Sequence, residues 1–211
     1  MKELTTYTYN GEVFTVILTR KKMKNIRYRL RDKTFYISAP YLATRGSIEK
    51  GLIKFAPQLI ASRKPQPMGE DYIYILGEKY PLSESGIINI SSDKIIKFKS
   101  QEDLMKKLKK FLLILVTKRV REYEQRMNLE AHNVRVRNMR SRYGSNSKRS
   151  RTVCFALSLV HYSIDIIDAI VVHELSHSIH FDHSPKFYSV VYTYCPDYDY
   201  LHKKLRKGIF K

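Results

Sequence analysis

The sequence contains no tryptophan and only two cysteines in 211 residues. Cys154 and Cys195 lie far apart and form no Cys-x-x-Cys pair, which excludes a disulfide framework and a cysteine-based metal knuckle. The longest apolar run, from Phe111 to Val116, is far shorter than the roughly 20 residues that a membrane helix needs. The first ten residues lack the charged-then-apolar pattern of a signal peptide. These absences predict a cytoplasmic protein without a membrane span.

Acidic residues are scarce. The chain has 20 Asp and Glu residues against 39 Lys and Arg residues, which gives a formal net charge of +19. Much of the positive charge is clustered at residues 20–31, 106–110 and 135–151. Clustered positive charge attracts polyanions, so a nucleic acid, a nucleotide or an anionic membrane surface is a candidate partner. The alternative is a compositional bias, because lysine is abundant throughout the chain. Hydrophobic residues make up 43% of the sequence, which is enough for a folded core and argues against disorder.

Residues 1–100 are expected to form a β-rich N-terminal region. Short alternating runs between residues 12 and 40 predict strands, and apolar residues near helical spacing predict one helix near residues 47–62. The stretch 63–71 is rich in Pro, Gly and charge and is the best linker candidate. Further strands are predicted between residues 72 and 98.

Residues 101–211 are expected to form a second domain in which strands and helices alternate. Apolar periodicity, helix caps and proline positions define its elements. The predicted elements are a long helix at 101–128, a strand at 134–137, a basic loop centred on Gly144, a buried strand from Thr152 to Leu159, a helix from Ile164 to about Phe181, and a helix from Pro185 to about Tyr194.

Four of the seven histidines fall within eleven residues, between His173 and His183. Within this segment, His173 and His177 are four residues apart and share one face of a helix, so both imidazoles can reach a single ion. Glu174 lies about 100° round the helix from His173, close enough to address a metal-bound water without ligating the metal. The preceding turns are apolar on more than one side, and a buried helix does not carry His, Glu and His without partners. The alternative is a helix that carries these polar residues but binds no metal.

His183 is the predicted third ligand. The segment 182–185 indicates that the helix stops near Phe181, which lets the chain turn and return His183 to the metal. His180 would fall in line with the other two ligands on a straight helix, a poor arrangement for a tetrahedral ion, and is assigned to packing beside the site. No glutamate follows Glu174, which excludes a glutamate third ligand from a following helix. Weaker substitutes for the third ligand are Asp197, Asp199 and His202.

The spacing H-E-x-x-H-x-x-x-x-x-H is also that of the metzincins. Metzincins have a glycine three residues after the second histidine, where this chain has His180. They also have a methionine turn, whereas no methionine follows Met139 here. The metzincin interpretation is therefore excluded.

The sequence resembles the YgjP-like family of zincin-type metal hydrolases, which are relatives of the WLM and SprT-like metalloproteases. The segments that carry the resemblance are SRYGSNS (141–147), the stretch 164–188 that contains HELSH, CPDY (195–198), RKKMKNIRYRL (20–30), ISAP (37–40) and LGEKYPL (76–82). They extend over nearly the whole chain. The family typically has a tryptophan and a cysteine where this chain has Tyr143 and Asn146.

This resemblance implies an α+β fold with a zincin-like core, in which the H-E-x-x-H helix packs on a small sheet and a β-rich N-terminal half precedes it. The ligand set that it implies for Zn²⁺ is His173, His177 and His183. The implied general base is Glu174. It also implies that the strand Thr152–Leu159 lines the cleft, where an extended peptide could pair with a free strand edge.

The predicted function is that of a zinc-dependent hydrolase, chiefly a metallopeptidase that acts on a peptide or protein. Glu174 would take a proton from a zinc-bound water and return it to the leaving group. Two alternatives remain: a nucleotide phosphohydrolase, and a nucleic-acid-binding protein with a structural zinc. Glu174 argues against the second, because a closed structural site needs no carboxylate beside its first ligand. Candidates for a further donor to the developing oxyanion, each also explicable as an ordinary packing or surface residue, are Arg142, Tyr192, Tyr194 and Tyr198.

Overall fold

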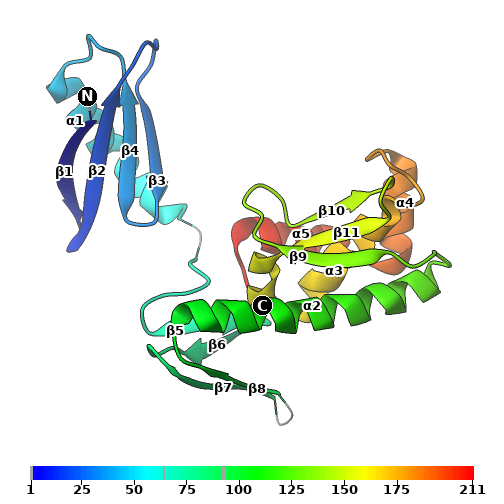
Figure 1. Ribbon diagram of the computed structural model, residues 1–211. Coiled ribbons are helices and arrows are strands. Elements are labelled where there is room, and N and C mark those ends of the chain that lie inside the picture. The colour runs from blue at the N-terminus through cyan, green and yellow to red at the C-terminus, as the bar shows by residue number, and fades with distance from the viewer. Residues whose placement is uncertain (1, 64, 92–93) are drawn as a thin grey trace. The chain divides into compact units, whose positions relative to one another are not determined.

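A computed structural model describes residues 2–63, 65–91 and 94–211 (Figure 1). The chain folds as two compact units, residues 1–64 and residues 65–211. The division coincides with the start of the predicted linker and falls earlier than the boundary expected at residue 100. The reason is that strands between residues 72 and 98 bury side chains such as Ile73 and Ile88 in the core of the second unit.

The first unit is a four-stranded sheet with one helix. Its strand order is β1-β2-β4-β3, in which β2 and β4 are parallel and the other pairs are antiparallel. The bounds are β1 Lys2–Tyr9, β2 Glu12–Arg20, β3 Arg27–Arg31, β4 Thr34–Ala39 and α1 Arg45–Ala61. The edge strand β1 was not predicted, because its Thr- and Tyr-rich sequence carries a weak hydrophobic signal.

One face of this sheet is covered and the other is open. Alternate residues of β2 and β4 point to the same side of the sheet, as the pleat requires. The buried side chains on that side include Phe14, Phe35 and Ile37, and they pack with Ile48 and Leu52 of α1. The opposite face of the sheet carries basic and polar residues together with exposed apolar and aromatic ones such as Leu4, Val13 and Tyr36.

The second unit holds two hairpins, a small mixed sheet and the remaining helices. Its elements are β5 Tyr72–Ile75, β6 Glu78–Pro81, β7 Gly86–Ser91, β8 Lys94–Phe98, α2 Gln101–Arg126, β9 Asn133–Arg137, β10 Gly144–Ser147, β11 Thr152–Ala156, the 3₁₀ helix η1 Leu157–His161, α3 Ile164–Ser176, α4 Pro185–Tyr194 and α5 Tyr198–Lys207. The α+β class predicted from the sequence is confirmed.

The long helix α2 organises this unit, running along it beneath the small sheet in Figure 1. Its buried side chains, which recur every four residues from Leu104 to Val120, form one apolar stripe. The helix α3 packs against α2 and is buried on nearly all sides, with every residue from Ile166 to Val172 inside. No helix in the described part of the chain is both long enough and apolar enough to cross a membrane.

The order of the small sheet, β10-β11-β9, corrects the expected position of the cleft strand. β11 is central, pairs with β10 on one side and β9 on the other, and is buried at all five residues. It therefore has no free edge, and it ends at Ala156 rather than Leu159. The strand at the edge beside α3 is β10, which the sequence predicted as a loop.

Candidate metal centre

The helix α3 ends at Ser176, five residues before the predicted end near Phe181, and His177 is its C-cap residue. His173 lies in the last turn and His177 directly follows it, so the two side chains still share one face. The backbone N–H of His180 donates to the carbonyl of Ser176 at 2.9 Å, which closes a tight turn after the helix. This early end directs the chain back toward the two histidines.

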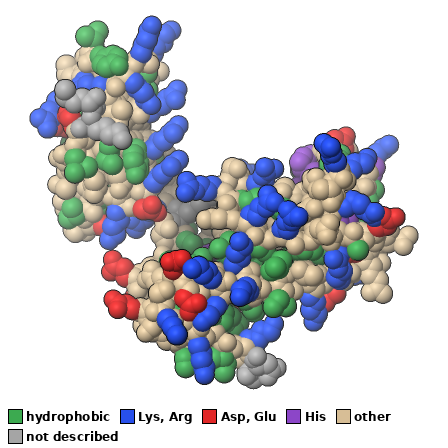
Figure 2. Space-filling model, viewed as in Figure 1, with side chains coloured by type: hydrophobic (Ala, Val, Ile, Leu, Met, Phe, Trp, Pro, Cys, Tyr) green, Lys and Arg blue, Asp and Glu red, His purple; other side chains and the backbone are tan. Residues whose placement is uncertain are grey.

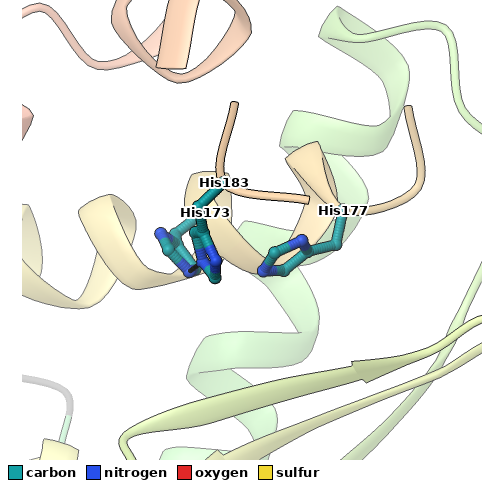
Figure 3. A group of neighbouring side chains, drawn as sticks. All are labelled: His173, His177 and His183. Atoms are coloured by element: carbon teal, nitrogen blue, oxygen red, sulfur yellow. Dashed lines mark hydrogen bonds between the residues drawn. The ribbon is translucent and has the colours of Figure 1, made fainter. Parts of the chain in front are cut away.

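The three histidines predicted as ligands converge. Ring nitrogens of His173, His177 and His183 all lie within 4.8 Å of one another. Figure 3 shows the three rings gathered at the end of α3. Nε2 of His183 is 3.3 Å from Nε2 of His173. Among the residues that the structure describes, this is the one such group of potential metal ligands, and neither His180 nor the substitutes near residues 197–202 join it.

The donor set fits a divalent cation. Burial lowers the pKa of His173 to about 3 and also lowers the pKa of His177, with the neighbouring histidines adding to both effects. Both rings are therefore neutral at neutral pH and offer lone pairs, as metal ligation requires. Two nitrogens each about 2.0–2.1 Å from a tetrahedral zinc would be separated by roughly 3.3 Å. The distance between the Nε2 atoms of His173 and His183 matches that separation.

Tyr198 fixes the orientation of His173. Its hydroxyl lies 2.8 Å from Nδ1 of His173, and the two rings are stacked with centroids 5.7 Å apart. The tyrosine is only 2% exposed, and burial raises its pKa. With Nδ1–H donating to this neutral hydroxyl, the imidazole keeps its lone pair at Nε2, the atom that faces His183.

Glu174 is buried beside the edge strand β10. The residue is 5% exposed, and burial raises its pKa to about 8 although the positive charge of Arg142 opposes the rise. A Cβ atom added at Gly144 would lie 2.3 Å from Oε1 of Glu174, so the carboxylate packs directly against the strand backbone. Asn146 donates its amide to the backbone carbonyl of Glu174 at 2.7 Å. These contacts hold the strand against the C-terminal end of α3.

The other predicted contact residues differ in their surroundings. Arg142 is exposed, and its charge acts on Glu174. Tyr192 is also exposed and donates its hydroxyl to Asp199 at 3.0 Å. Tyr194 is half-buried and packs against the core of the second unit. Of the three, only Arg142 has an electrostatic link to the site.

Phe187 is a site residue that the sequence analysis missed. It is fully buried on α4, and its ring centroid lies 5.0, 4.6 and 4.9 Å from those of His173, His177 and His183, respectively. Ser184 caps α4, and the buried pair Phe187 and Val191 recurs at helical spacing. That pattern could have predicted an apolar face of α4 against the histidines. The ring excludes water from one side of the site and so strengthens electrostatic interactions there.

A buried polar network supports the turn after α3. Nδ1 of His132 lies 2.9 Å from Oε1 of Glu124, and its Nε2 lies 2.9 Å from Oγ of Ser178. Ser178 also accepts a hydrogen bond from Asn146 at 3.0 Å. The network joins α2, β10 and the turn, and thus holds the segment that leads to His183.

Residues 24–208 match the family described as YgjP-like, metallopeptidase domain. Among solved structures, the chain is similar to the metallopeptidase zymogen jannalysin of Methanocaldococcus jannaschii, with 21% identity, a TM-score of 0.40, and coverage of 44% of this chain and 94% of that chain. It is also similar to the metallopeptidase zymogen abylysin of Pyrococcus abyssi, with 17% identity, a TM-score of 0.37, and coverage of 44% and 96%. Both solved structures correspond to less than half of this chain. A comparison with curated proteins gave no match.

Proposed function

The chain belongs to the YgjP-like family of metallopeptidase domains, and on this basis we propose that it is a zinc-dependent peptidase whose metal is held by His173, His177 and His183. The observation that carries the proposal is the convergence of three imidazole nitrogens beside a buried carboxylate. When bound, zinc polarises a substrate carbonyl and lowers the pKa of a water molecule at an open coordination position.

Glu174 is the proposed general base. Its carboxylate follows the first histidine directly and is not part of the three-histidine group, so it remains free to exchange protons. In its ionised form it would accept a proton at a carboxylate oxygen and then donate that proton to the amine that leaves. Arg142, whose charge reaches Glu174, is the proposed further donor to the oxyanion that forms during attack.

The edge strand β10 is the proposed binding site for the substrate backbone. Among the described strands, β10 pairs only with β11, so its outer edge can accept an extended peptide. Gly144 begins this strand against Glu174, so a peptide added to the strand would run past the proposed base. The absence of a side chain at Gly144 is what allows this close approach.

The test is turnover by the zinc-loaded protein and its Glu174→Gln variant. Both proteins would be screened against a mixed peptide library by mass spectrometry and against the nucleoside triphosphates by phosphate release. We expect peptide cleavage by the wild type and a loss of 10²- to 10⁴-fold in the variant, the usual contribution of a general base. Zinc content and circular dichroism should not change, because Gln is nearly isosteric with Glu.

Other outcomes would replace the proposal. Release of phosphate without peptide cleavage would identify a nucleotide phosphohydrolase instead. Full activity of the Glu174→Gln variant would show that the carboxylate takes no part in the mechanism and would favour a structural role for the metal.

A further inference from the structure

The positive charge of this protein is concentrated in its smaller unit. Residues 1–64 contain 14 Lys and Arg residues and four Asp and Glu residues, a net formal charge of +10. The 147 residues of the second unit carry a net formal charge of +9. Charge density in the first unit is therefore more than twice as high.

Four of these 14 cations line one cavity on the open face of the four-stranded sheet. Arg27, Arg29 and Arg31 alternate along β3 and are all exposed, and in register they face Ser38, Tyr36 and Thr34 of β4. Figure 2 shows Lys and Arg side chains in a column along the β3 side of the N-terminal unit. A shallow cavity of about 230 Å³ is lined by the residues Lys21, Arg27, Arg29, Arg31, Tyr36 and Ser38.

Among the described residues, no ion pair involves the four cations of this cavity. Other cations of the same unit do form ion pairs, such as Arg20 with Glu3. Like charges held close together repel one another. Folding gives no reason for this column, so the column points to an anionic ligand.

An aromatic ring lies beside the column. Tyr36 is 43% exposed at the centre of the open face, where its register partners are Arg29 on β3 and Ile17 on β2. Beyond Ile17 in the same row, Leu4 of β1 is 76% exposed. The row thus passes from a cation through an aromatic ring to apolar side chains, which combines a phosphate contact with a surface on which a base can stack.

We propose that the open face of the first unit binds single-stranded nucleic acid. The four cations contact successive backbone phosphates, and Tyr36 stacks on a base. A single strand fits better than a duplex, because the faces of bases in a duplex are stacked on one another and cannot reach Tyr36. The line of Arg27, Arg29 and Arg31 along β3 also suits a linear polyanion better than a membrane surface. This proposal does not depend on the metal centre.

The binding test uses the full-length, zinc-loaded protein and fluorescence anisotropy. The probes are a labelled 15-nucleotide single strand as RNA and as DNA, a duplex of the same sequence, and vesicles containing phosphatidylserine. We expect the tightest binding to a single strand. The logarithm of its association constant should fall linearly with the logarithm of the salt concentration, with a slope of about −0.7 for each phosphate contact.

Charge removal tests the location of the site. In the variant with Arg27, Arg29 and Arg31 changed to Gln, the salt slope should fall by about 2, since three phosphate contacts are lost. Circular dichroism should be unchanged, because all three side chains are exposed.

A matched control removes the same charge from the helix that covers the other sheet face. Arg45, Lys50 and Lys54 are exposed on α1, and their change to Gln should leave the affinity and salt slope close to those of the wild type. Equal losses in the two triple variants would overturn the assignment to the open face and leave only non-specific charge attraction.

The aromatic ring is tested separately. Tyr36→Ala should weaken single-strand binding about tenfold, within the range for loss of one stacked base, whereas Tyr36→Phe should retain the affinity. Tighter binding of the duplex or the vesicles than of the single strand would overturn the proposal in favour of those ligands. Absence of single-strand binding at low salt would overturn it altogether.

Discussion

Nδ1 of His173 and the hydroxyl of Tyr198 are 2.8 Å apart, and their rings are stacked with an angle of 14° between the planes. The tyrosine begins α5 and lies in the CPDY segment, 25 residues beyond the histidine. A hydrogen bond from Nδ1–H to the tyrosine determines which nitrogen of His173 can bind a metal. The segment after α4 thus acts on the metal centre through one imidazole.

Removal of the Tyr198 hydroxyl should weaken metal binding without unfolding the protein. In Tyr198→Phe the ring packing remains, but Nδ1 of the half-buried His173 loses its hydrogen-bond partner. We expect zinc affinity to fall by 10- to 100-fold, the usual effect of losing a hydrogen bond to a ligand. Competition with a chromophoric chelator measures this loss. Tyr192→Phe is the matched control, because its hydroxyl bonds to Asp199 on the surface, and a similar loss in that variant would contradict the role given to Tyr198.

His183 and His180 should differ in their effect on bound zinc. His183→Ala removes a ring nitrogen that lies 3.3 Å from Nε2 of His173, and should lose most of the metal. His180→Ala should keep it, since His180 lies outside the group of converging rings. The zinc content of the two purified variants shows which of the two histidines binds the metal. Retention of zinc in the first variant and its loss in the second would reverse the ligand assignment.

The histidine cluster could be predicted from sequence because its geometry is local. Two residues four apart on a helix share a face whatever surrounds them, and the polar residues around Asp182 to Pro185 stop a helix by their own chemistry. Even the error in the end of α3, at Ser176 instead of about Phe181, left the outcome unchanged. The chain still turned back and brought His183 near His173.

The surroundings of the cluster could not be predicted, because they depend on pairing between distant segments. Residues 144–147 have the composition of a loop and become a strand only by pairing with β11. The observed boundary between the units differs from the predicted one at residue 100 for the same reason, because the hairpins between residues 72 and 98 pack in the same hydrophobic core as α2. The partner of His173 on α5 is likewise set by the packing of helices far apart in sequence.

Gly144→Ala should lower the rate of peptide cleavage without changing the fold. An added Cβ would lie 2.3 Å from Oε1 of Glu174, so the carboxylate must move by about 1 Å to restore contact distance. A displacement of that size at a catalytic group can cost roughly 10²-fold in rate. We expect unchanged zinc content and a comparable loss in kcat for peptide cleavage. Gly46→Ala on α1 is the control, because nothing lies within 4 Å of the added atom, and equal activity of the two variants would contradict the contact.

The ion pair between Arg119 of α2 and Asp168 of α3 should stabilise the second unit. Nε of Arg119 donates to one carboxylate oxygen of Asp168 at 2.6 Å, and a second guanidinium nitrogen bonds to the other oxygen. Asp168→Ala removes the bidentate partner of the partly buried guanidinium and leaves it only the carboxylate of Glu122. We expect a loss of about 2 kcal/mol in the free energy of unfolding, less than the 3–5 kcal/mol of a fully buried pair, because the Arg119 side chain is 26% exposed.

Replacement of both partners distinguishes this ion pair from mere packing. In the double variant Arg119→Met and Asp168→Leu no buried charge remains, so most of the lost stability should return, as it does when hydrophobic residues replace a buried pair. Urea unfolding followed by the helical circular dichroism signal measures both variants. Lys106→Ala serves as the control, because the Lys106–Glu102 pair on the same helix is exposed and should contribute nothing measurable. A double variant no more stable than Asp168→Ala would show that the two side chains stabilise α2 and α3 by their shape rather than by their charges.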